Sequence, residues 1–290
     1  MRAPRRYAVL AVLTSILVFL AGGTVPAAQA ATTPTGDALA RRAISTLNEW
    51  TNWLDANNVR GYVGEVGWPH DDPRWSDVAH AWYGAAEAAG LPVTTWVTGE
   101  WAGWHPLANY VFSGPDWTFK ATSASDVMEA HPGTPTAPHG VNVTGPEMGT
   151  PAIDATSGFS NESVGALEQN YHYDGASTFT YLASHGVQVV RIPFRWERLQ
   201  RSLYAPLDVA ELARLKAMVR TASDAGLRVV LDMHNYGGYY LANGTGGVRR
   251  AIGSAELPVT AFKDVWARIA WAFSGDASVW AFGLMNEPVN

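Results

Sequence analysis

Segments with the pattern of a buried strand alternate with segments that have the pattern of an amphipathic helix along residues 38–287. The strand-like runs are short and rich in β-branched residues, and most of the helix-like runs end at a glycine. Strands that alternate with helices in this way form right-handed βαβ units on a parallel sheet. The predicted strands are 60–66, 91–97, 139–145, 187–194, 227–235 and 279–287, and the predicted helices are 38–54, 75–90, 176–186, 208–226 and 259–273.

Polar side chains stand at the carboxyl ends of these predicted strands. Glu65 lies at the end of the first, Arg191 in the fourth, Asp232 in the fifth and Asn286 in the last. A (β/α)₈ barrel builds its active site at this end of its strands. A doubly wound sheet is the competing fold, but no strand is followed by a G-x-G-x-x-G or G-x-x-x-x-G-K-[ST] loop, so nucleotide binding has no support.

The first 30 residues have the pattern of a secretory signal peptide. Three arginines precede an apolar stretch over 7–21, and Ala28-Gln29-Ala30 is a small-residue cleavage site. The alternative is a membrane anchor, but a run of about fifteen residues is short for a hydrocarbon core about 30 Å thick. We therefore expect a secreted protein, exported by the general or the twin-arginine route.

Charge and cysteine content exclude several classes of partner and site. The 20 basic residues include three arginines in the first 30, so the mature chain has 17 basic and 26 acidic residues and a net charge of −9 with histidine neutral. This charge argues against nucleic acid or an anionic membrane as partner. The chain has no cysteine, which excludes disulfides, thiolate metal sites and cysteine nucleophiles.

Tryptophan and tyrosine are abundant, with 13 and 11 copies. Many lie beside glycine, aspartate or histidine, as in "GWPHDDPRW", "GEWAGWH" and "HNYGGYY". Exposed aromatic rings in polar surroundings suit a ligand with flat apolar faces, such as a sugar, although core packing is the alternative for each. The candidates for sugar binding are Trp68, Trp101, Trp104, Tyr236 and Tyr239.

Three strand-end motifs carry a family resemblance. "VVRIPFRWERLQ", "VVLDMHNYGGYY" and "WAFGLMNEP" resemble, in this order, the second, third and fourth strands of glycoside hydrolase family 5, the large cellulase and mannanase family. The resemblance implies that Glu287 is the general acid/base and that Asn286 binds a sugar 2-hydroxyl. It also implies that Arg191 supports the nucleophile, and that His234 and Asn235 line the central subsite.

The start of the chain resembles the end of the same barrel. "GYVGEVGWP" resembles the seventh strand with its nucleophile, which would be Glu65, and "LPVTTWVTGEW" resembles the eighth strand, whose tryptophan would be Trp96. The resemblance therefore predicts a (β/α)₈ barrel in the permuted order 7-8-1-2-3-4, truncated so that strands 5 and 6 are missing. The predicted segments are 31–104 for strands 7 and 8, a Pro/Gly-rich connector over 105–138, and 139–290 for strands 1 to 4.

The implied activity is retaining hydrolysis of a β-1,4-linked polysaccharide by two glutamates. Glu287 would begin protonated and Glu65 ionised, with Arg191 lowering the pKa of Glu65. β-Mannan is an alternative substrate. A non-catalytic glycan-binding protein, or a barrel whose strands 5 and 6 come from a second chain, is an alternative to the enzyme.

Each of these residues also has a plainer role open to it. Glu65 could be a surface acid, Arg191 a buried ion-pair residue and His234 a satisfied core histidine. Asp232 and His234 have no third metal ligand at strand or helix spacing, so we expect no metal and no cofactor. The only expected partner is the polysaccharide, and the complete protein is expected to be a monomer.

Overall fold

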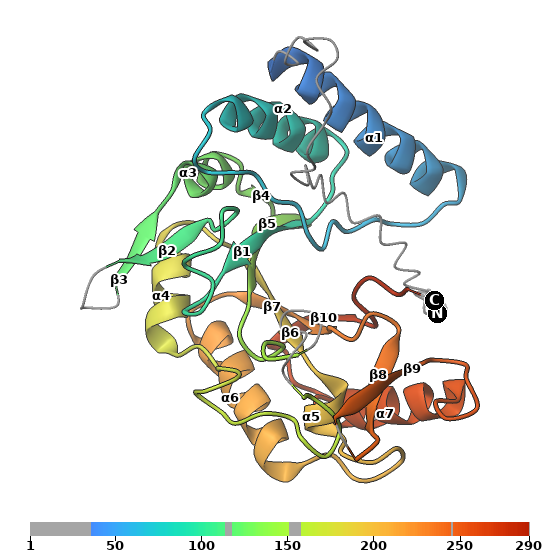
Figure 1. The fold of residues 1–290 in the computed structure, drawn as a ribbon. Coiled ribbons are helices and arrows are strands. Elements are labelled where there is room, and N and C mark those ends of the chain that lie inside the picture. Colours follow the sequence, from blue (N-terminus) through green and yellow to red (C-terminus); the bar gives the residue numbers. More distant parts are fainter. Residues whose placement is uncertain (1–35, 114–117, 151–157, 245, 290) are drawn as a thin grey trace, which may run out of the picture.

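The computed structural model describes residues 36–113, 118–150, 158–244 and 246–289 (Figure 1). Its centre is a parallel sheet in the order β1-β5-β6-β7-β10, as the alternation of strands and helices predicted. These strands are β1 (Val93–Thr98), β5 (Ala137–Val143), β6 (Val189–Phe194), β7 (Arg228–Met233) and β10 (Val279–Gly283). The predicted signal peptide lies outside the described residues.

The predicted strand over 60–66 is reduced to a single parallel bridge between Val63 and Val93. Its backbone still follows β1, since the Thr94 amide donates to the Val63 carbonyl at 2.9 Å. The Gly64 carbonyl, however, accepts from the side chains of Thr94 and Asn142 instead of from a neighbouring strand. The segment thus extends the sheet beyond β1 without completing a regular strand.

The two central strands are buried along their whole length. All seven residues of β5 and all six of β6 are buried, because parallel sheets of this class are covered on both faces. In Figure 1, α1 (Gly36–Ala56) and α2 (Arg74–Ala88) lie together near the β1 side of the sheet. The helices α6 (Val209–Asp224) and α7 (Val259–Ala272) lie on the side of β7 and β10.

The start of α6 has one half of the predicted capping box. The Asp208 carboxylate accepts a hydrogen bond from the Glu211 amide at 2.9 Å and so caps the helix. The reciprocal bond is replaced, because the Glu211 carboxylate accepts from the hydroxyls of Tyr171 and Tyr173 at 3.1 and 2.9 Å. The predicted irregular loop over 159–175, which contains both tyrosines, has no helix or named strand.

The segment expected to be an irregular connector contains regular elements. They are β2 (Tyr110–Ser113), β3 (Thr118–Ala121), α3 (Ser123–Ala130) and β4 (Gly133–Thr134), with β2 and β3 paired as an antiparallel hairpin. The helix α3 begins at a full capping box, in which Thr122 and Ser125 exchange side-chain to backbone bonds. An eight-residue helix is too short to show a sustained hydrophobic period. The capping residues Thr122 and Ser125 were therefore the sequence feature that could have predicted it.

Three smaller elements complete the described chain: α4 (Ala176–Ser184), α5 (Trp196–Leu199), and an antiparallel hairpin of β8 (Gly238–Ala242) and β9 (Gly247–Ala251). Within the described residues, no pairing joins β10 to the Val63 segment, so the sheet is open. The described part of the chain has no helix whose length and apolar character would let it cross a bilayer.

Candidate active site

Arg191, on the central strand β6, joins side chains from both edges of the sheet. Its Nη1 donates to Glu65 Oε1 at 2.5 Å, and its Nη2 donates to Asn286 Oδ1 at 2.8 Å. The same Nη2 lies 2.8 Å from Asp232 Oδ2 on β7. Arg191 is 2% exposed, so the guanidinium is a buried cation held between two carboxylates and the amides of Asn286 and Asn142.

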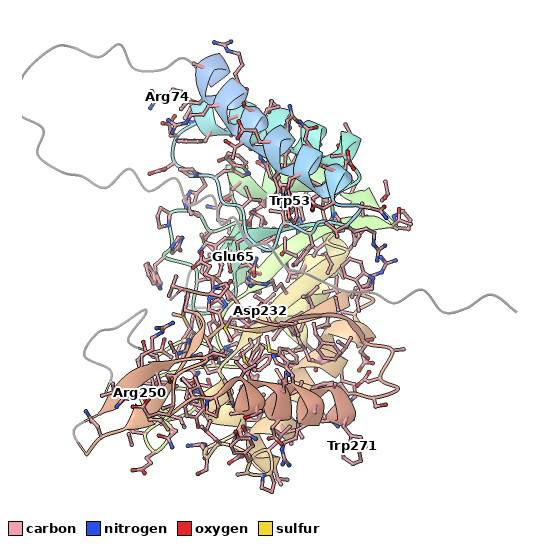
Figure 2. The ribbon with its side chains drawn as sticks, turned by 90° about the vertical axis from the view of Figure 1, so that its right-hand side faces the viewer. Trp53, Glu65, Arg74, Asp232, Arg250 and Trp271 are labelled. Atoms are coloured by element: carbon pink, nitrogen blue, oxygen red, sulfur yellow. The ribbon has the colours of Figure 1, made fainter. Side chains whose placement is uncertain are left out.

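The curvature of the sheet makes this junction possible. Glu65 belongs to the segment beyond β1, whereas Asn286 follows β10 at the other end of the strand order. Both reach one guanidinium on the strand between them, so the carboxyl ends of the two edges converge. Figure 2 shows Glu65 and Asp232 near each other at the centre of the molecule. Glu65 and Asn286, far apart in sequence, therefore meet at one guanidinium.

His234 connects the remaining members of this cluster. Its Nδ1 lies 3.1 Å from Asp232 Oδ2, and its Nε2 lies 3.1 Å from Asn286 Nδ2. The amide nitrogen of Asn286 can only donate, so His234 Nε2 is the acceptor and the ring carries its proton on Nδ1. The Trp96 ring stacks on His234 with centroids 6.3 Å apart and planes 16° from parallel. Trp96 is partly exposed and can present its other face to a ligand.

Burial and charge act differently on the two carboxylates that share Arg191. Burial raises the pKa of Glu65 above its ordinary value, and the positive charge of Arg191 offsets this only in part. For Asp232, burial also opposes ionisation, but Arg191 together with the hydrogen bond from His234 holds the pKa below its ordinary value. Arg191 thus acts on the pKa of Glu65 in the expected direction, but burial has the larger effect and the net shift is upward. One guanidinium is shared by two acids, and among the described residues Asp232 has a second donor, His234, whereas Glu65 has none.

Glu287 follows Asn286 directly and is half-buried, with a left-handed backbone at φ 36°. The Tyr236 hydroxyl lies within the electrostatic reach of both glutamates. Burial raises the pKa of this hydroxyl, and the charges of Glu65 and Glu287 raise it further. Tyr236 also packs edge-on against His234, with ring centroids 5.2 Å apart.

Three predicted site residues lie outside this cluster. The Asn235 amide is used internally, because it accepts from the Trp196 backbone and donates to the Glu197 carboxylate. Trp68 is 7% exposed and packs against the core residue Trp82 and the half-buried Trp75. Trp101 stacks on His172, with ring centroids 5.7 Å apart.

Two further residues belong to the cluster: Asn142, which was not predicted, and Asp232, which was noted at a strand end but given no role. Asn142, on β5, accepts from Arg191 Nη1 at 2.7 Å and donates to the Gly64 carbonyl at 2.8 Å. Asn142 thus connects the segment that contains Glu65 to Arg191 on β6. The available signal was position, since both residues are polar groups near the carboxyl end of a predicted buried strand, as Arg191 is.

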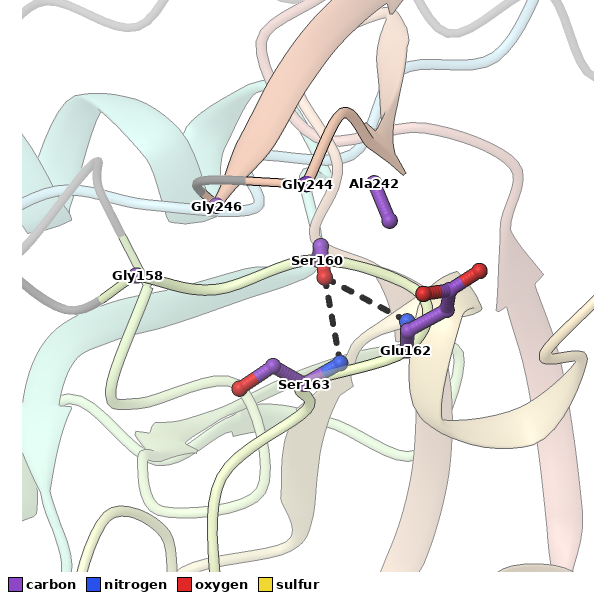
Figure 3. Close-up of a pocket in the computed structure, with 7 residues that line it drawn as sticks. All are labelled: Gly158, Ser160, Glu162, Ser163, Ala242, Gly244 and Gly246. Carbon is purple, nitrogen blue, oxygen red and sulfur yellow. Dashed lines mark hydrogen bonds between the residues drawn. The ribbon is translucent and has the colours of Figure 1, made fainter.

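A separate pocket of about 330 Å³ lies between the loop at 158–163 and the tip of the β8–β9 hairpin (Figure 3). Glycine and serine dominate its lining, with Glu162 as the charged member. None of the predicted site residues lines it. It therefore contributes nothing to the cluster around Arg191.

Comparison with known proteins agrees with the strand-end motifs. The sequence profile of the cellulase family, glycosyl hydrolase family 5, matches residues 144–290. The manganese dependent endoglucanase Eg5A of Phanerodontia chrysosporium is 27% identical over 168 residues, which are 57% of this chain and 40% of that protein. Endoglucanase gh5-1 of Neurospora crassa is 30% identical over 118 residues, which are 40% of this chain and 27% of that protein.

Among solved structures, Pseudomonas stutzeri endoglucanase Cel5A in complex with cellobiose is similar, with 34% identity and a TM-score of 0.43. The match covers 52% of this chain and 40% of that chain. The chain spans less than half the length of the curated relatives it matches. Because the family profile matches slightly more than half of the chain, this protein belongs to the cellulase family, glycosyl hydrolase family 5.

Proposed function

We propose that this protein is a retaining glycosidase that hydrolyses internal bonds of β-1,4-glucan. Glu65 attacks the anomeric carbon as nucleophile, and Glu287 protonates the leaving glycosidic oxygen. Glu287 then deprotonates the water that hydrolyses the glycosyl-enzyme, so two inversions give net retention. A retaining enzyme holds its two carboxyl groups about 5–5.5 Å apart, and convergence of Glu65 and Asn286 on one guanidinium supports such an approach.

Each of the other site residues has a part in this mechanism. Arg191 and Asn142 hold the Glu65 segment, and the Arg191 charge stabilises the ionised nucleophile. Asn286, fixed by Arg191 and His234, is placed to bind a sugar hydroxyl beside Glu287. Trp96 offers an apolar face to a sugar ring. His234 and Asp232 act through Asn286 and Arg191, as positioning residues.

We also infer that the fold is a circularly permuted (β/α)₈ barrel. The Val63 segment, β1, β5, β6, β7 and β10 then correspond to barrel strands 7, 8, 1, 2, 3 and 4. The sheet order supports this correspondence, because β1 pairs with β5 as strand 8 pairs with strand 1 in a closed barrel. Strands 5 and 6 would lie between β10 and the Val63 segment.

The substrate class follows from the relatives and from the site. The similar proteins are named as endoglucanases or endo-β-1,4-glucanases, and their substrate comes to this chain as a proposal. The secretory pattern of residues 1–30 is consistent with a polymer that is too large to enter a cell. β-Mannan, which differs in the orientation of one hydroxyl, is the substrate against which selectivity is measured.

Proton NMR of the reaction mixture tests this function directly. When the protein is added to a soluble β-1,4-glucan oligosaccharide, the β-anomer of the new reducing end is expected to appear first. The α-anomer then grows by mutarotation. Initial release of the α-anomer would contradict the retaining mechanism. Binding to glucan without release of reducing ends would instead identify a glycan-binding protein.

The raised pKa of Glu65 predicts an early loss of activity in acid. Glu65 must be ionised to attack, so activity falls as pH falls through its pKa. If Glu65 had the ordinary pKa of 4.5, half of it would be ionised at pH 4.5 and half of the maximal kcat/KM would remain. Since burial raises the pKa, we expect less than half to remain at pH 4.5, measured as the pH profile of kcat/KM. Retention of more than half at that pH would contradict the prediction.

A further inference from the structure

A second cluster of ionisable groups lies outside the site around Arg191. Glu100 follows β1, whereas His172 and Asp174 precede α4. His172 Nε2 lies 2.9 Å from Glu100 Oε2 and 3.3 Å from Asp174 Oδ1. One ligand atom from each of the three residues lies within 4.8 Å of the others. A single ion could therefore contact all three.

The buried Asp174 carboxylate is the least satisfied member of this cluster. Its side chain is fully buried, and its Oδ1 accepts from the Glu100 amide at 3.1 Å. Its Oδ2 is buried without a hydrogen-bond partner among the described residues. Gly99 passes so close that an added Cβ would lie 3.2 Å from Oδ2. A buried carboxylate oxygen without a partner is costly, and a bound cation would offset that cost.

His172 is oriented as metal-ligating histidines usually are. Its Nδ1 lies 2.6 Å from Glu168 Oε2, and a carboxylate at this second nitrogen fixes the ring and directs Nε2 toward a metal. Trp101 stacks on the ring and restricts its rotation. The carboxylates of Glu100, Glu168 and Asp174 thus surround one imidazole.

Within the described part of the chain, neither Glu100 nor Asp174 forms an ion pair with an arginine or lysine. We propose that Glu100, His172 and Asp174 bind one divalent transition-metal ion. One imidazole nitrogen with two carboxylate oxygens suits Zn²⁺ or Mn²⁺, whereas Ca²⁺ and Mg²⁺ prefer oxygen ligands alone. Three protein ligands leave further coordination positions for water.

The bound ion would clamp the loop that follows β1 to the loop that precedes α4. Residues 99–101 follow β1, the strand that carries Trp96, and residues 168–174 lead into α4. A ligand from each loop on one ion would fix their separation and hold Trp101 against His172. This clamp is independent of the reaction, because none of its ligands contacts Arg191, Glu65 or Asn286 in the hydrogen bonds and ion pairs of the described residues.

Isothermal titration of the untagged, EDTA-dialysed chain with Zn²⁺ alone, and separately with Mn²⁺ alone, tests the proposal. We expect binding of one ion that Glu100→Gln and Asp174→Asn each weaken at least about tenfold. Glu168→Gln should weaken it by about 10–100-fold, the usual effect of losing the second partner of a ligating histidine. Zinc at 100 times its Kd should raise the Tm of the unaltered chain by about 5 °C.

His131→Gln is the matched control. His131 lies 2.9 Å from Glu87 and 3.1 Å from His80, so this second histidine–carboxylate group is the rival site for the same ions. We expect His131→Gln to bind Zn²⁺ as the unaltered chain does. Loss of binding in His131→Gln with retention in Glu100→Gln would overturn the proposal, as would no binding by the unaltered chain. Glu100→Gln and Glu168→Gln alter partly exposed side chains, so they remain informative if Asp174→Asn misfolds.

Discussion

Glu65→Gln and Glu287→Gln are each expected to lower kcat/KM on β-1,4-glucan by at least about 10³-fold while leaving glucan binding intact. General acid/base assistance contributes roughly 10²–10⁴-fold, and loss of the nucleophile prevents the covalent intermediate altogether. Glutamine keeps the shape of the side chain but can neither attack nor transfer the proton. Initial rates on soluble glucan and binding isotherms on insoluble cellulose measure the two effects separately.

Azide distinguishes the roles of the two glutamates. In Glu65→Ala, azide can enter from the face that the nucleophile has left, and displacement of an activated β-glucoside then gives an α-glycosyl azide. In Glu287→Ala, the glycosyl-enzyme still forms from a substrate with a good leaving group, and azide attacks it to give a β-glycosyl azide. Glu256→Gln, a change at an exposed ion pair with Arg250, is the control and should retain full activity. Reversed products would exchange the two assignments, and full activity in either glutamine variant would refute the mechanism.

Arg191→Met is expected to lower the free energy of unfolding by about 3–5 kcal/mol, the usual effect of removing one partner from a buried ion pair. Methionine fills similar space but leaves Glu65 and Asp232 buried without their shared cation. Arg191 also fixes Asn286. No other side chain could replace it here, because only the guanidinium has several donors in one plane. Urea denaturation followed by tryptophan fluorescence measures the change, and activity should be lost in the same variant.

Two further variants separate the charge from the packing. Asp232→Asn in the Arg191→Met background removes one of the two buried carboxylate charges that have lost their cation. Part of the lost free energy of unfolding should therefore return. Arg268→Met removes an exposed cation paired with Asp264 and should shift the urea midpoint far less. An unchanged midpoint in Arg191→Met would show that the buried network does not hold the two edges of the sheet together.

The elements of the fold could be predicted where the chain carries long, regular patterns. The strands β6, β7 and β10 begin within two residues of their predicted starts, because short apolar runs between turn residues leave few alternatives. The hairpin and helix between residues 110 and 130 were missed, since each is shorter than the window that a periodicity needs. The Val63 segment was predicted as a strand. However, hydrogen bonds from the Thr94 and Asn142 side chains to the Gly64 carbonyl replace part of the backbone hydrogen bonding of a regular strand.

The candidate site was predictable where a residue has a distinctive neighbourhood and not where its partners decide its role. Asn235 has the same chemistry as Asn142, yet Asn235 braces α5 and β8 while Asn142 binds Arg191. Trp68 and Trp96 both stand near the end of a predicted strand, but one lies in the core and the other stacks on His234. Sequence context alone could not separate these pairs.

The sequence by itself determined the alternation of helices with the strands of a parallel sheet, and the family of the protein. It also determined that Glu65, Arg191, His234 and Glu287 lie near strand ends. These features depend on local pattern and residue type, which are readable along the chain. Only the tertiary structure decided that one guanidinium joins the two edges and that Glu65, not Asp232, has the raised pKa. It also decided that Glu100 meets His172 and Asp174. Each of these depends on burial and on distances between residues remote in sequence, which folding alone establishes.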